Sequence, residues 1–454
     1  MKSGTGLISS DEIALTRECL DYARKAGADA VRVCLSKSVQ NSISVLDGKM
    51  DKVSYSADRS LCFHLFSNGR YGAFSTNRLE RTNLEKFIKE ALDTVRVLSP
   101  DPCRCLPDKK RKAAACSEGD ELDLFDPEFF SLSLEDRTAL AVASCRYPEE
   151  GDGWKTVSVE AEYSDSLDDC FLTDSDGFEG RHCETAFGMS AEATVADAQG
   201  RKSSGYWWRT SPKFSKADIS DICSTAVEKA ASMTGDPGLV SGRQNVIIDP
   251  CCASRLVAPL LSALDGQNIQ QHNSFLEGTL GEKVFTADFT LIDDSLAAGR
   301  AGSRLFDSEG VAVKEGPVIE NGIIRKFFIN SYIARKMKME GTVECVSRPA
   351  IAPFICNSDK KSIHLDDIMS YCADGLYITE FNGGNCNSAT GNFSFGVAGF
   401  VFHDGKIGRP VREVLMTGDM RTLWNNLVAA GSDARECARW QIPTLAFRNV
   451  DLNA

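Results

Sequence analysis

The five histidines are the residues best suited to hold a catalytic metal, yet their spacing argues against such a site. They are His64, His182, His272, His364 and His403. A zinc site needs nitrogen or sulfur donors that converge on one ion, and a helical site places two histidines about one turn apart. No two of these histidines have that spacing. Cys103-x-Cys105 and Cys251-Cys252 lack a matching second pair, so we expect no metal site.

Nucleophilic chemistry has no local signature either. The sequence contains no Gly-x-Ser-x-Gly elbow, no Walker loop and no dinucleotide-binding fingerprint, which argues against the commonest hydrolases, kinases and Rossmann enzymes. A Cys/His pair stays open, because such partners meet in space rather than in sequence. The 17 cysteines are scattered through apolar patterns, so we expect most of them to be small core side chains. Their odd number, without a signal-type N-terminus, predicts reduced thiols and a cytoplasmic location.

The segment with the most binding potential is Phe381–Gly396, which we interpret as a long connection between strands Tyr377–Glu380 and Ala398–His403. Its glycines allow a close backbone approach, and its Asn and Ser side chains offer donors and acceptors. An equally weighted alternative is that these side chains satisfy the segment's own backbone. The candidate peptide-binding or partner-binding residues are Gly383, Gly384, Asn385, Asn387, Thr390, Gly391, Asn392 and Ser394.

Helices and hairpins are predicted for an N-terminal region, residues 1–100. Asp11 can cap a helix that runs to about Lys25. Asp47-Gly48 and Asn68-Gly69 accept the positive φ of type I′ turns, so each predicts a hairpin. Thr82-x-x-Glu85 has the form of a capping box and predicts the start of a second helix.

A proline-rich linker separates this region from a middle region, residues 101–235, and a larger strand-rich C-terminal domain, residues 236–454. The basic run Lys109–Lys112 in the linker is interpreted as a solvated face. Asp174–Gly177 resembles the start of a calcium loop, but Leu172 would occupy the first ligand position, so we interpret it as a turn. The class is α+β, with mostly antiparallel sheets and flanking helices.

Charge and hydropathy exclude two classes of ligand. The chain has 454 residues with 51 Lys plus Arg against 64 Asp plus Glu, a formal net charge of -13. Such a surface repels phosphate backbones, so we expect no direct nucleic-acid binding. No apolar run approaches the roughly 18 residues of a membrane helix, so we expect no membrane partner.

Several motifs resemble the TldD/TldE family, whose TldE member is also called PmbA and whose members are often labelled modulators of DNA gyrase. The resemblance rests on Ala28–Gly48, Gly69–Asn77, Thr173–Gly177 and above all Thr390–Ser394. Shorter matches follow at Ile378–Glu380, Ala398–Phe400 and Pro443–Leu445. The resemblance implies a peptidase-like architecture and peptide substrates.

In that family the active TldD-type subunit carries His-Glu-x-x-x-His on a helix, with zinc on the two histidines. Here Val257, Ala258 and Ser262 stand near those three positions. Neither Val nor Ala can bind zinc or move a proton, so we assign no catalytic or metal-binding residue. Cys437 lies near the position of a third family ligand, but we transfer no metal role to it.

The chain therefore looks like the TldE-type subunit, which the resemblance pairs with a zinc-bearing TldD-type paralogue in a heteromeric peptidase. We expect no cofactor in this subunit and zinc in its partner. Two alternatives stay open: a non-enzymatic homodimeric scaffold or peptide-binding protein, and an independent hydrolase that uses one of the cysteines. The sequence selects neither the peptide nor the choice between homodimer and heterodimer.

Overall fold

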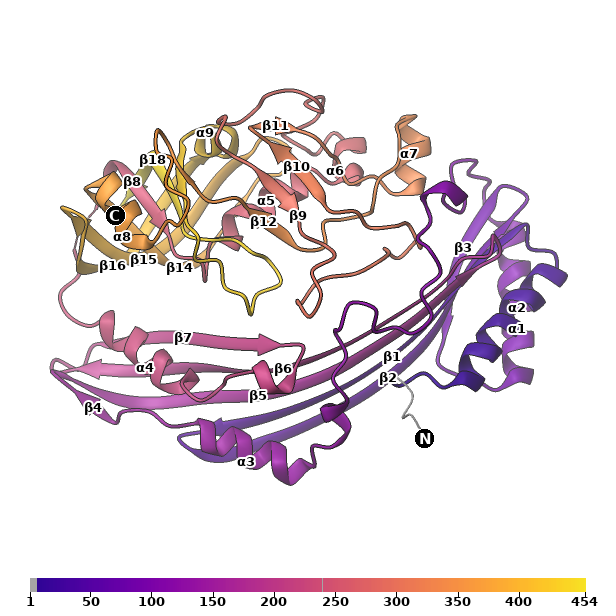
Figure 1. Ribbon diagram of the computed structural model, residues 1–454, viewed down its shortest axis with the longest axis horizontal. Coiled ribbons are helices and arrows are strands. Elements are labelled where there is room, and N and C mark those ends of the chain that lie inside the picture. The colour runs from indigo at the N-terminus through magenta and orange to yellow at the C-terminus, as the bar shows by residue number, and fades with distance from the viewer. Residues whose placement is uncertain (1–5, 239) are drawn as a thin grey trace.

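The computed structural model describes residues 6–238 and 240–454 and confirms the α+β class with mostly antiparallel sheets (Figure 1). The helices are α1 Ser10–Lys25, α2 Arg81–Val97, α3 Leu134–Ser144, α4 Ile222–Ser232, α5 Ser254–Ala263, α6 Gly266–Gln270, α7 Ser331–Met337, α8 Leu365–Cys372 and α9 Met420–Asn425. The strands are β1 Ala30–Leu46, β2 Lys49–Ser67, β3 Arg70–Thr76, β4 Glu150–Gly151, β5 Trp154–Asp174, β6 Glu179–Asp197, β7 Lys202–Ser211, β8 Gly242–Ile248, β9 Leu291–Asp293, β10 Gly316–Glu320, β11 Ile323–Ile324, β12 Pro349–Ile351, β13 Phe354–Ile355, β14 Gly375–Cys386, β15 Asn392–His403, β16 Lys406–Asp419, β17 Leu427–Ala430 and β18 Leu445–Asn453. No helix among the described residues is long and apolar enough to cross a membrane.

One long sheet contains the strands of the first two predicted regions. Its order is β3-β2-β1-β5-β6-β7, and β4 pairs with β5 at the side. Strand β5 is the longest member, a single strand of 21 residues. The turn prediction is confirmed, since Asp47 and Asn68 have φ of 48° and 52° and each is followed by a positive-φ glycine.

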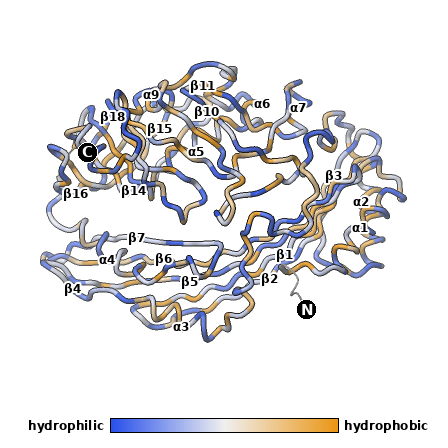
Figure 2. The backbone as a smooth tube through the Cα atoms, viewed as in Figure 1, coloured by the Kyte–Doolittle hydropathy of each residue, from blue (hydrophilic) through white to orange (hydrophobic). Residues whose placement is uncertain are grey.

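Hydrophilic and hydrophobic residues are interspersed along the strands of this sheet (Figure 2). Since successive side chains of a strand point to opposite faces, the two faces differ in polarity. On β1, Val31, Val33 and Leu35 pack against α1 and α2, while Ile43 and Val45 pack against α3 and α4. All four helices therefore cover the same face. The C-terminal region lies over the opposite, more polar face (Figure 1).

Both predicted starts of the N-terminal helices need correction. Helix α1 begins earlier than Asp11 requires, because Ser9 is its N-cap and forms a capping box with Glu12. The predicted capping box Thr82-x-x-Glu85 is wrong, since α2 starts at Arg81 and no side chain caps it. Amphipathic packing of α2 against the sheet, rather than a cap, fixes this start.

The linker also differs from expectation, because its basic run is partly buried. Lys112 Nζ lies 2.6 Å from Asp174 and 3.2 Å from Asp176, and its side chain is 6% exposed. Arg111 donates to the carbonyl of Thr342. Acidic residues of the β5–β6 turn thus draw the run onto the protein. Lys109 keeps the predicted solvated character, at 69% side-chain exposure.

The C-terminal region contains two sheets and the largest hydrophobic core. The orders are β13-β17-β18-β16-β15-β14-β8 and β11-β10-β9-β12. Strand β8 runs parallel to β14, while the other strand pairs of the described residues are antiparallel. Helix α5 packs into this core through Leu256, Val257 and Leu260. Trp424 is buried in this core and stacks on Phe289, with 4.7 Å between the ring centroids.

The long connection predicted at Phe381–Gly396 is wrong. Strand β14 continues to Cys386 and β15 begins at Asn392, so most of the segment is a paired hairpin with a short tip. The polar composition suggested a loop. One face of this hairpin is exposed to solvent, however, so polar side chains on that face can alternate with Phe393 and Phe395, which are buried on the other.

The cysteine expectation is corrected as well. All 17 cysteines are free, as predicted for reduced thiols, but just six of them are buried. Those six are Cys19, Cys116, Cys145, Cys183, Cys223 and Cys372. Some of the others, such as Cys34 and Cys170, lie on the polar face of the long sheet, where strand alternation places a small residue beside serines.

Candidate functional site

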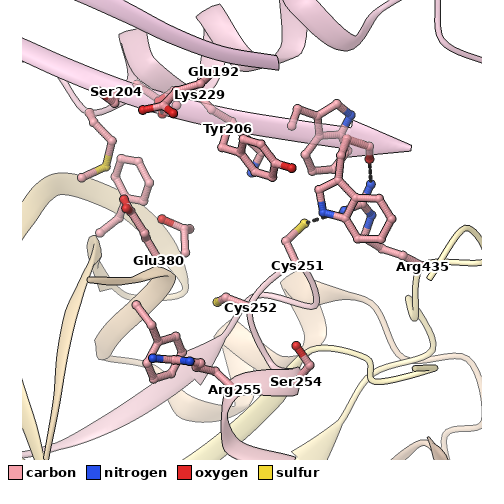
Figure 3. A pocket seen from close by; sticks show the side chains of 18 residues that line it. Glu192, Ser204, Tyr206, Lys229, Cys251, Cys252, Ser254, Arg255, Glu380 and Arg435 are labelled. Atoms are coloured by element: carbon pink, nitrogen blue, oxygen red, sulfur yellow. Dashed lines mark hydrogen bonds between the residues drawn. The ribbon is translucent and has the colours of Figure 1, made fainter. Parts of the chain in front are cut away.

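A cleft of about 490 Å³ lies between the long sheet and the C-terminal region (Figure 3). The sheet side comes from β6, β7 and α4, and the other side from β14, β15 and the segment that leads into α5. Its residues include Glu192, Tyr206, Trp207, Trp208, Lys229, Cys251, Cys252, Ser254, Arg255, Thr379, Glu380, Phe381, Phe400 and Arg435. Aromatic rings with a few charged groups are typical of a ligand pocket.

Strand β14 presents a free hydrogen-bonding edge at this cleft. On one side it pairs with β8, but only at Leu376–Ile378. From Thr379 to Cys386, β15 is its single partner among the described strands. Thr379, Glu380 and Phe381 from this stretch line the cleft. An extended peptide could therefore add to β14 as a further strand.

Arg435 links the two walls of the cleft. Its guanidinium carbon lies 4.1 Å from the ring centroid of Trp207 and 4.6 Å from that of Trp208. The same group donates to the carbonyl of Trp208 and, at 3.7 Å, to the thiol of Cys251. Lys229 Nζ lies 4.9 Å from the Trp207 centroid. The tryptophans are thus held by cations at the edge of the long sheet.

The cleft carries opposite charges on separate residues. Glu192 and Glu380 supply carboxylates from the two walls (Figure 3). Desolvation in the cleft, followed by repulsion from Glu192, raises the pKa of Glu380. Lys229, Arg255 and Arg435 supply positive charge. Such a site can hold a ligand that bears both a carboxylate and an ammonium group.

The two cleft cysteines are unsuited to nucleophilic attack. Burial, followed by the nearby Asp249 carboxylate, raises the pKa of Cys251 to about 12. The same two causes raise the pKa of Cys252 well above its usual value. Asp249 itself accepts hydrogen bonds from the Tyr377 hydroxyl and the Cys251 backbone. Since the thiolate is the nucleophilic form, these protonated thiols count against a cysteine hydrolase at this cleft.

Helix α5 carries the positions that the family resemblance singled out, and their chemistry does not fit zinc. Val257 is buried in the core, whereas Ala258 and Ser262 are exposed. Ser262 Oγ accepts a hydrogen bond of 3.1 Å from Asn268. Three side chains that include two hydrocarbons cannot form the nitrogen-rich shell that zinc requires. The interior proline of this helix, Pro259, also removes one backbone donor.

Elsewhere in the described chain, one group of acidic and histidine side chains could approach a metal ion, but it lies outside the cleft. Asp374, His403 and Asp404 bring potential ligand atoms within 4.8 Å of one another, and all three are exposed. They lie where β14 begins and where β15 ends, away from the residues that line the cleft. Exposed groups of this kind are better explained as turn residues with mutual ion pairs.

The hairpin tip uses part of its predicted binding groups internally. Asn387 Oδ1 accepts hydrogen bonds from the backbones of Ala389 and Thr390 at 3.0 and 3.1 Å. Gly391 has φ of 82° and packs against Phe275 and Asp419. Gly384 permits the close approach of β15, because an added Cβ would lie 2.0 Å from the Ser394 carbonyl oxygen. Asn387, Gly384 and Gly391 therefore shape the tip.

The other predicted residues form the outward face of the hairpin. Asn385 is opposite Ser394, and Gly383 is opposite Gly396, across the β14–β15 pair. The side chains of Asn385 and Asn392 are exposed and make no hydrogen bond within the described part of the chain. Strand β14 leads from the cleft to this tip, but Gly383, Asn385, Asn392 and Ser394 are not among the residues that line the cleft, so their binding role stays a prediction.

Sequence reasoning missed the aromatic half of the cleft. Tyr206, Trp207, Trp208 and Arg435 are not among the candidate residues that the sequence singles out. The available signal was three consecutive aromatic residues in one short strand. Since strand side chains alternate, such a run must expose at least one ring to the polar face. Arg435 had no signal, because its contacts reach across 227 positions of the chain.

Comparison with protein-family descriptions assigns nearly the whole chain. Residues 31–94 match the "PmbA/TldA metallopeptidase domain 1", residues 127–234 its central domain and residues 241–454 its C-terminal domain. The cleft residues come from the second and third of these parts.

Relatives and solved structures agree with this assignment. A Bacteroides thetaiotaomicron structure described as a putative modulator of DNA gyrase has a TM-score of 0.92 and 34% identity, covering 99% of this chain and 100% of that chain. The "Metalloprotease PmbA" of Escherichia coli O157:H7 is 24% identical over 409 residues, 89% of this chain and 88% of the relative. TldE from Thermococcus kodakarensis shares the fold, with a TM-score of 0.79 and 19% identity over 97% of this chain and 100% of that chain.

Proposed function

The chain belongs to the PmbA/TldD metallopeptidase family, and on that premise we propose that it is the TldE/PmbA-type subunit of a heteromeric cytoplasmic peptidase. In this proposal a TldD-type paralogue supplies zinc and the catalytic groups. The present chain completes the peptide-binding chamber and has no turnover of its own.

The observation that carries this proposal is the chemistry of α5. Its family positions hold Val257, Ala258 and Ser262. The two hydrocarbon side chains can neither bind zinc nor transfer a proton, and one serine hydroxyl does not make a zinc site. The wall beside α5 nevertheless keeps the features of a binding site, since Ser254, Arg255 and the free edge of β14 line one cleft. The zinc ligands of the family motif are absent here, but the cleft beside them is present. This combination favours a role in peptide binding rather than in catalysis.

We further propose that peptides bind in an extended conformation along Thr379–Cys386. Backbone hydrogen bonds to a sheet edge do not depend on the peptide's sequence, so they give affinity for varied substrates. The rings of Tyr206 and Trp208 would contact peptide side chains from the opposite wall, while Trp207 packs on the α4 side of β7. Arg255 and Glu380 offer partners for the peptide's charged groups.

A non-enzymatic homodimeric peptide-binding protein is the second candidate. The same cleft and the same free edge serve it, and the α5 residues permit it equally. The two candidates differ in one requirement, which is a paralogue with the His-Glu-x-x-x-His motif that binds this chain.

The decisive experiment measures zinc content and peptide hydrolysis for this chain alone, for the paralogue from the same cell alone, and for their mixture. We expect the isolated chain to be metal-free and inert, and the mixture to form a stable complex that hydrolyses peptides. Stoichiometric zinc with hydrolysis by the isolated chain would refute the proposal. A paralogue that neither binds this chain nor gains activity from it would favour the homodimeric alternative.

A further inference from the structure

A second, smaller cavity lies at the end of the long sheet where α7 is beside β3 (Figure 1). Its volume is about 140 Å³, and none of its residues lines the cleft. That volume is several times the roughly 30 Å³ share of one water molecule, so a small ligand fits. The long sheet, the linker and the C-terminal region all contribute to its wall, through Arg32, Tyr71, Arg104, Glu309, Tyr332 and Glu344 among others.

Arg32 in this wall is buried and has an unused hydrogen-bond donor. Its side chain is 9% exposed, and its Nε has no hydrogen-bond partner among the described residues. Asp174 is directly opposite on β5, but Lys112 and two backbone groups already occupy its oxygens. The Glu309 carboxylate lies 3.9 Å from Nη1, which is too far for a hydrogen bond. A buried cation needs hydrogen-bonded partners, so the open Nε marks a place for a ligand.

His64 does not satisfy the neighbouring nitrogen of Arg32. Arg32 Nη2 lies 3.4 Å from His64 Nδ1, and the Tyr71 hydroxyl lies 2.7 Å from the same ring nitrogen. Burial, followed by repulsion from Arg32 and Arg104, lowers the pKa of His64 to about 4. The ring is therefore neutral near pH 7, and its Nδ1 offers at most one lone pair. Because the hydroxyl is closer, the Nε–Nη2 edge of Arg32 lacks a full partner.

The same edge of two other arginines in this chain holds a carboxylate. Arg17 Nε and Nη2 donate to the two oxygens of Glu179 at 2.8 and 2.7 Å. Arg181 Nε and Nη2 donate to the two oxygens of Asp169 at 3.0 and 2.7 Å. The two parallel N–H groups match the spacing of two oxygens in a carboxylate or a phosphate. In Arg32 no such group occupies this edge among the described residues.

Arg104 supplies a second cation with unused donors. Its guanidinium carbon lies 3.5 Å from the ring centroid of Tyr332 and 4.8 Å from that of Tyr71. The side chain makes no hydrogen bond with the described part of the chain. Contact with the aromatic rings fixes the guanidinium, while its N–H groups stay available to a ligand.

The two glutamates of the wall are already engaged. Both oxygens of Glu344 accept hydrogen bonds from Ser308, at 3.0 Å from its backbone and 2.6 Å from its hydroxyl. Glu309 Oε2 accepts from the Ser331 backbone at 2.8 Å. Their charge weakens the attraction for an anion, so we expect moderate affinity. It does not supply acceptors for Arg32 Nε or for Arg104.

We propose that this cavity binds a small oxyanion, a carboxylate or a phosphate, through the Nε–Nη2 edge of Arg32 and the guanidinium of Arg104. The site is separate from the peptide cleft and does not depend on the proposed peptidase role. Since the long sheet, the linker and the C-terminal region all contribute to the wall, a bound anion connects the three parts. Binding to the folded chain alone also stabilises it.

Isothermal titration calorimetry of the full chain tests the site, with sodium acetate and sodium phosphate as separate probes. Tris buffer is used, and sodium chloride keeps the ionic strength constant. We expect saturable binding of at least one probe, with a dissociation constant below about 1 mM. Tighter binding of phosphate identifies a phosphate group as the natural ligand, and tighter binding of acetate identifies a carboxylate.

Two variants assign the binding to this cavity. Arg32→Lys keeps the charge but removes the two parallel donors, and Arg104→Ala removes the second cation. Each should raise the dissociation constant by about tenfold or more. The control is Arg243→Ala, an exposed arginine that pairs with Asp451 outside this cavity, and its affinity should equal that of the wild type.

Far-ultraviolet circular dichroism confirms the fold of each variant, and Arg104→Ala decides alone if the buried Arg32→Lys does not fold. Absence of saturable binding of both probes up to about 10 mM would overturn the proposal. So would binding that Arg104→Ala leaves unchanged, or that Arg243→Ala weakens equally.

Discussion

Lys112 and Asp174 form a buried ion pair that fastens the linker to the long sheet: Nζ lies 2.6 Å from Oδ2, with side-chain exposures of 6% and 0%. The second oxygen of Asp174 accepts hydrogen bonds from the backbones of Asp176 and Phe178. The carboxylate is therefore fixed in place whether or not the lysine is present.

Removing this lysine should destabilise the protein strongly. Lys112→Ala leaves a buried carboxylate without its cation, so we expect a loss of about 3 kcal/mol in the free energy of unfolding, measured by urea denaturation. Lys109→Ala is the matched control, because Lys109 pairs with Asp176 at 3.5 Å but is 69% exposed. Its loss should stay below about 1 kcal/mol. Equal losses of unfolding free energy for the two variants would show that burial of the Lys112–Asp174 pair does not make its loss more costly.

Asp307 should make stability fall as the pH rises. Desolvation, followed by repulsion from Glu344, raises the pKa of Asp307 to about 6. An unfolded aspartate has a pKa of about 3.9, so the fold favours the protonated form. The stability that this preference contributes is complete below about pH 4 and is lost as the pH rises through about 6, by about 3 kcal/mol.

Unfolding free energies between about pH 4 and 7 measure this effect. The free energy of unfolding of the wild type minus that of Asp307→Asn, taken at each pH, should decrease across this interval. That variant keeps one acceptor oxygen and cannot ionise, so its own profile should lack the corresponding decline. Parallel profiles for the two proteins would show that Asp307 has an ordinary pKa.

Arg435 should control the environment of the cleft tryptophans. Arg435→Ala removes the cation above Trp207 and Trp208. We expect the tryptophan fluorescence emission to shift and the free energy of unfolding to fall by about 1–2 kcal/mol. Arg435→Lys keeps the charge but not the planar group that stacks on both rings. Its tryptophan emission should therefore lie between that of the wild type and that of Arg435→Ala. Emission identical to the wild type in Arg435→Ala would show that the two walls do not touch in solution.

The hairpin tip should matter for peptide turnover without affecting the fold. Asn392→Ala removes an exposed amide that has no internal partner among the described residues, so stability should stay within about 0.5 kcal/mol of the wild type. In the complex with the paralogue, the KM for peptides should rise several-fold. Asn83→Ala, an exposed asparagine on α2, is the control.

Gly391→Val tests whether the backbone conformation of the tip matters, whereas Asn392→Ala tests a single side chain of the same tip. A valine there needs φ of 82°, and its Cβ would lie 3.1 Å from Asp419 and 3.2 Å from Phe275. We expect a destabilised tip and a larger loss of turnover than Asn392→Ala causes. Unchanged assembly and turnover in both variants would remove the hairpin from the binding wall.

Local chemistry made part of the fold predictable. Asp47-Gly48 and Asn68-Gly69 form turns in the structure because the positive φ they need is a property of those residues themselves. Helix α9 has a local cap of the same kind, since the Asp419 side chain accepts a hydrogen bond from the Thr422 backbone. Such interactions span a few positions and leave a direct trace in the sequence.

Distant partners made the rest unpredictable. Lys112 was assigned to a solvated face because Asp174 lies 62 positions away. The hairpin at Phe381–Gly396 was assigned to a loop because its polar face is open while Phe393 and Phe395 are buried by other strands. Arg435 could not be found, since its role depends on Trp208, which lies in the long sheet 227 positions away. For the candidate site, composition pointed to the hairpin tip, which stays a prediction, and gave no sign of the aromatic wall of the cleft.

The pairing of β1 with β5 also determines the order of events during synthesis. Residues 32–46 of β1 pair with residues 160–174 of β5. The ribosome adds roughly 130 residues between the end of β1 and the end of β5, which takes about 6 to 25 seconds at usual rates. During that interval the β1–β2 hairpin exists with its inner edge unprotected. Helices α1 and α2 can already cover its apolar end, so the nascent chain depends on them, or on a chaperone, until β5 arrives.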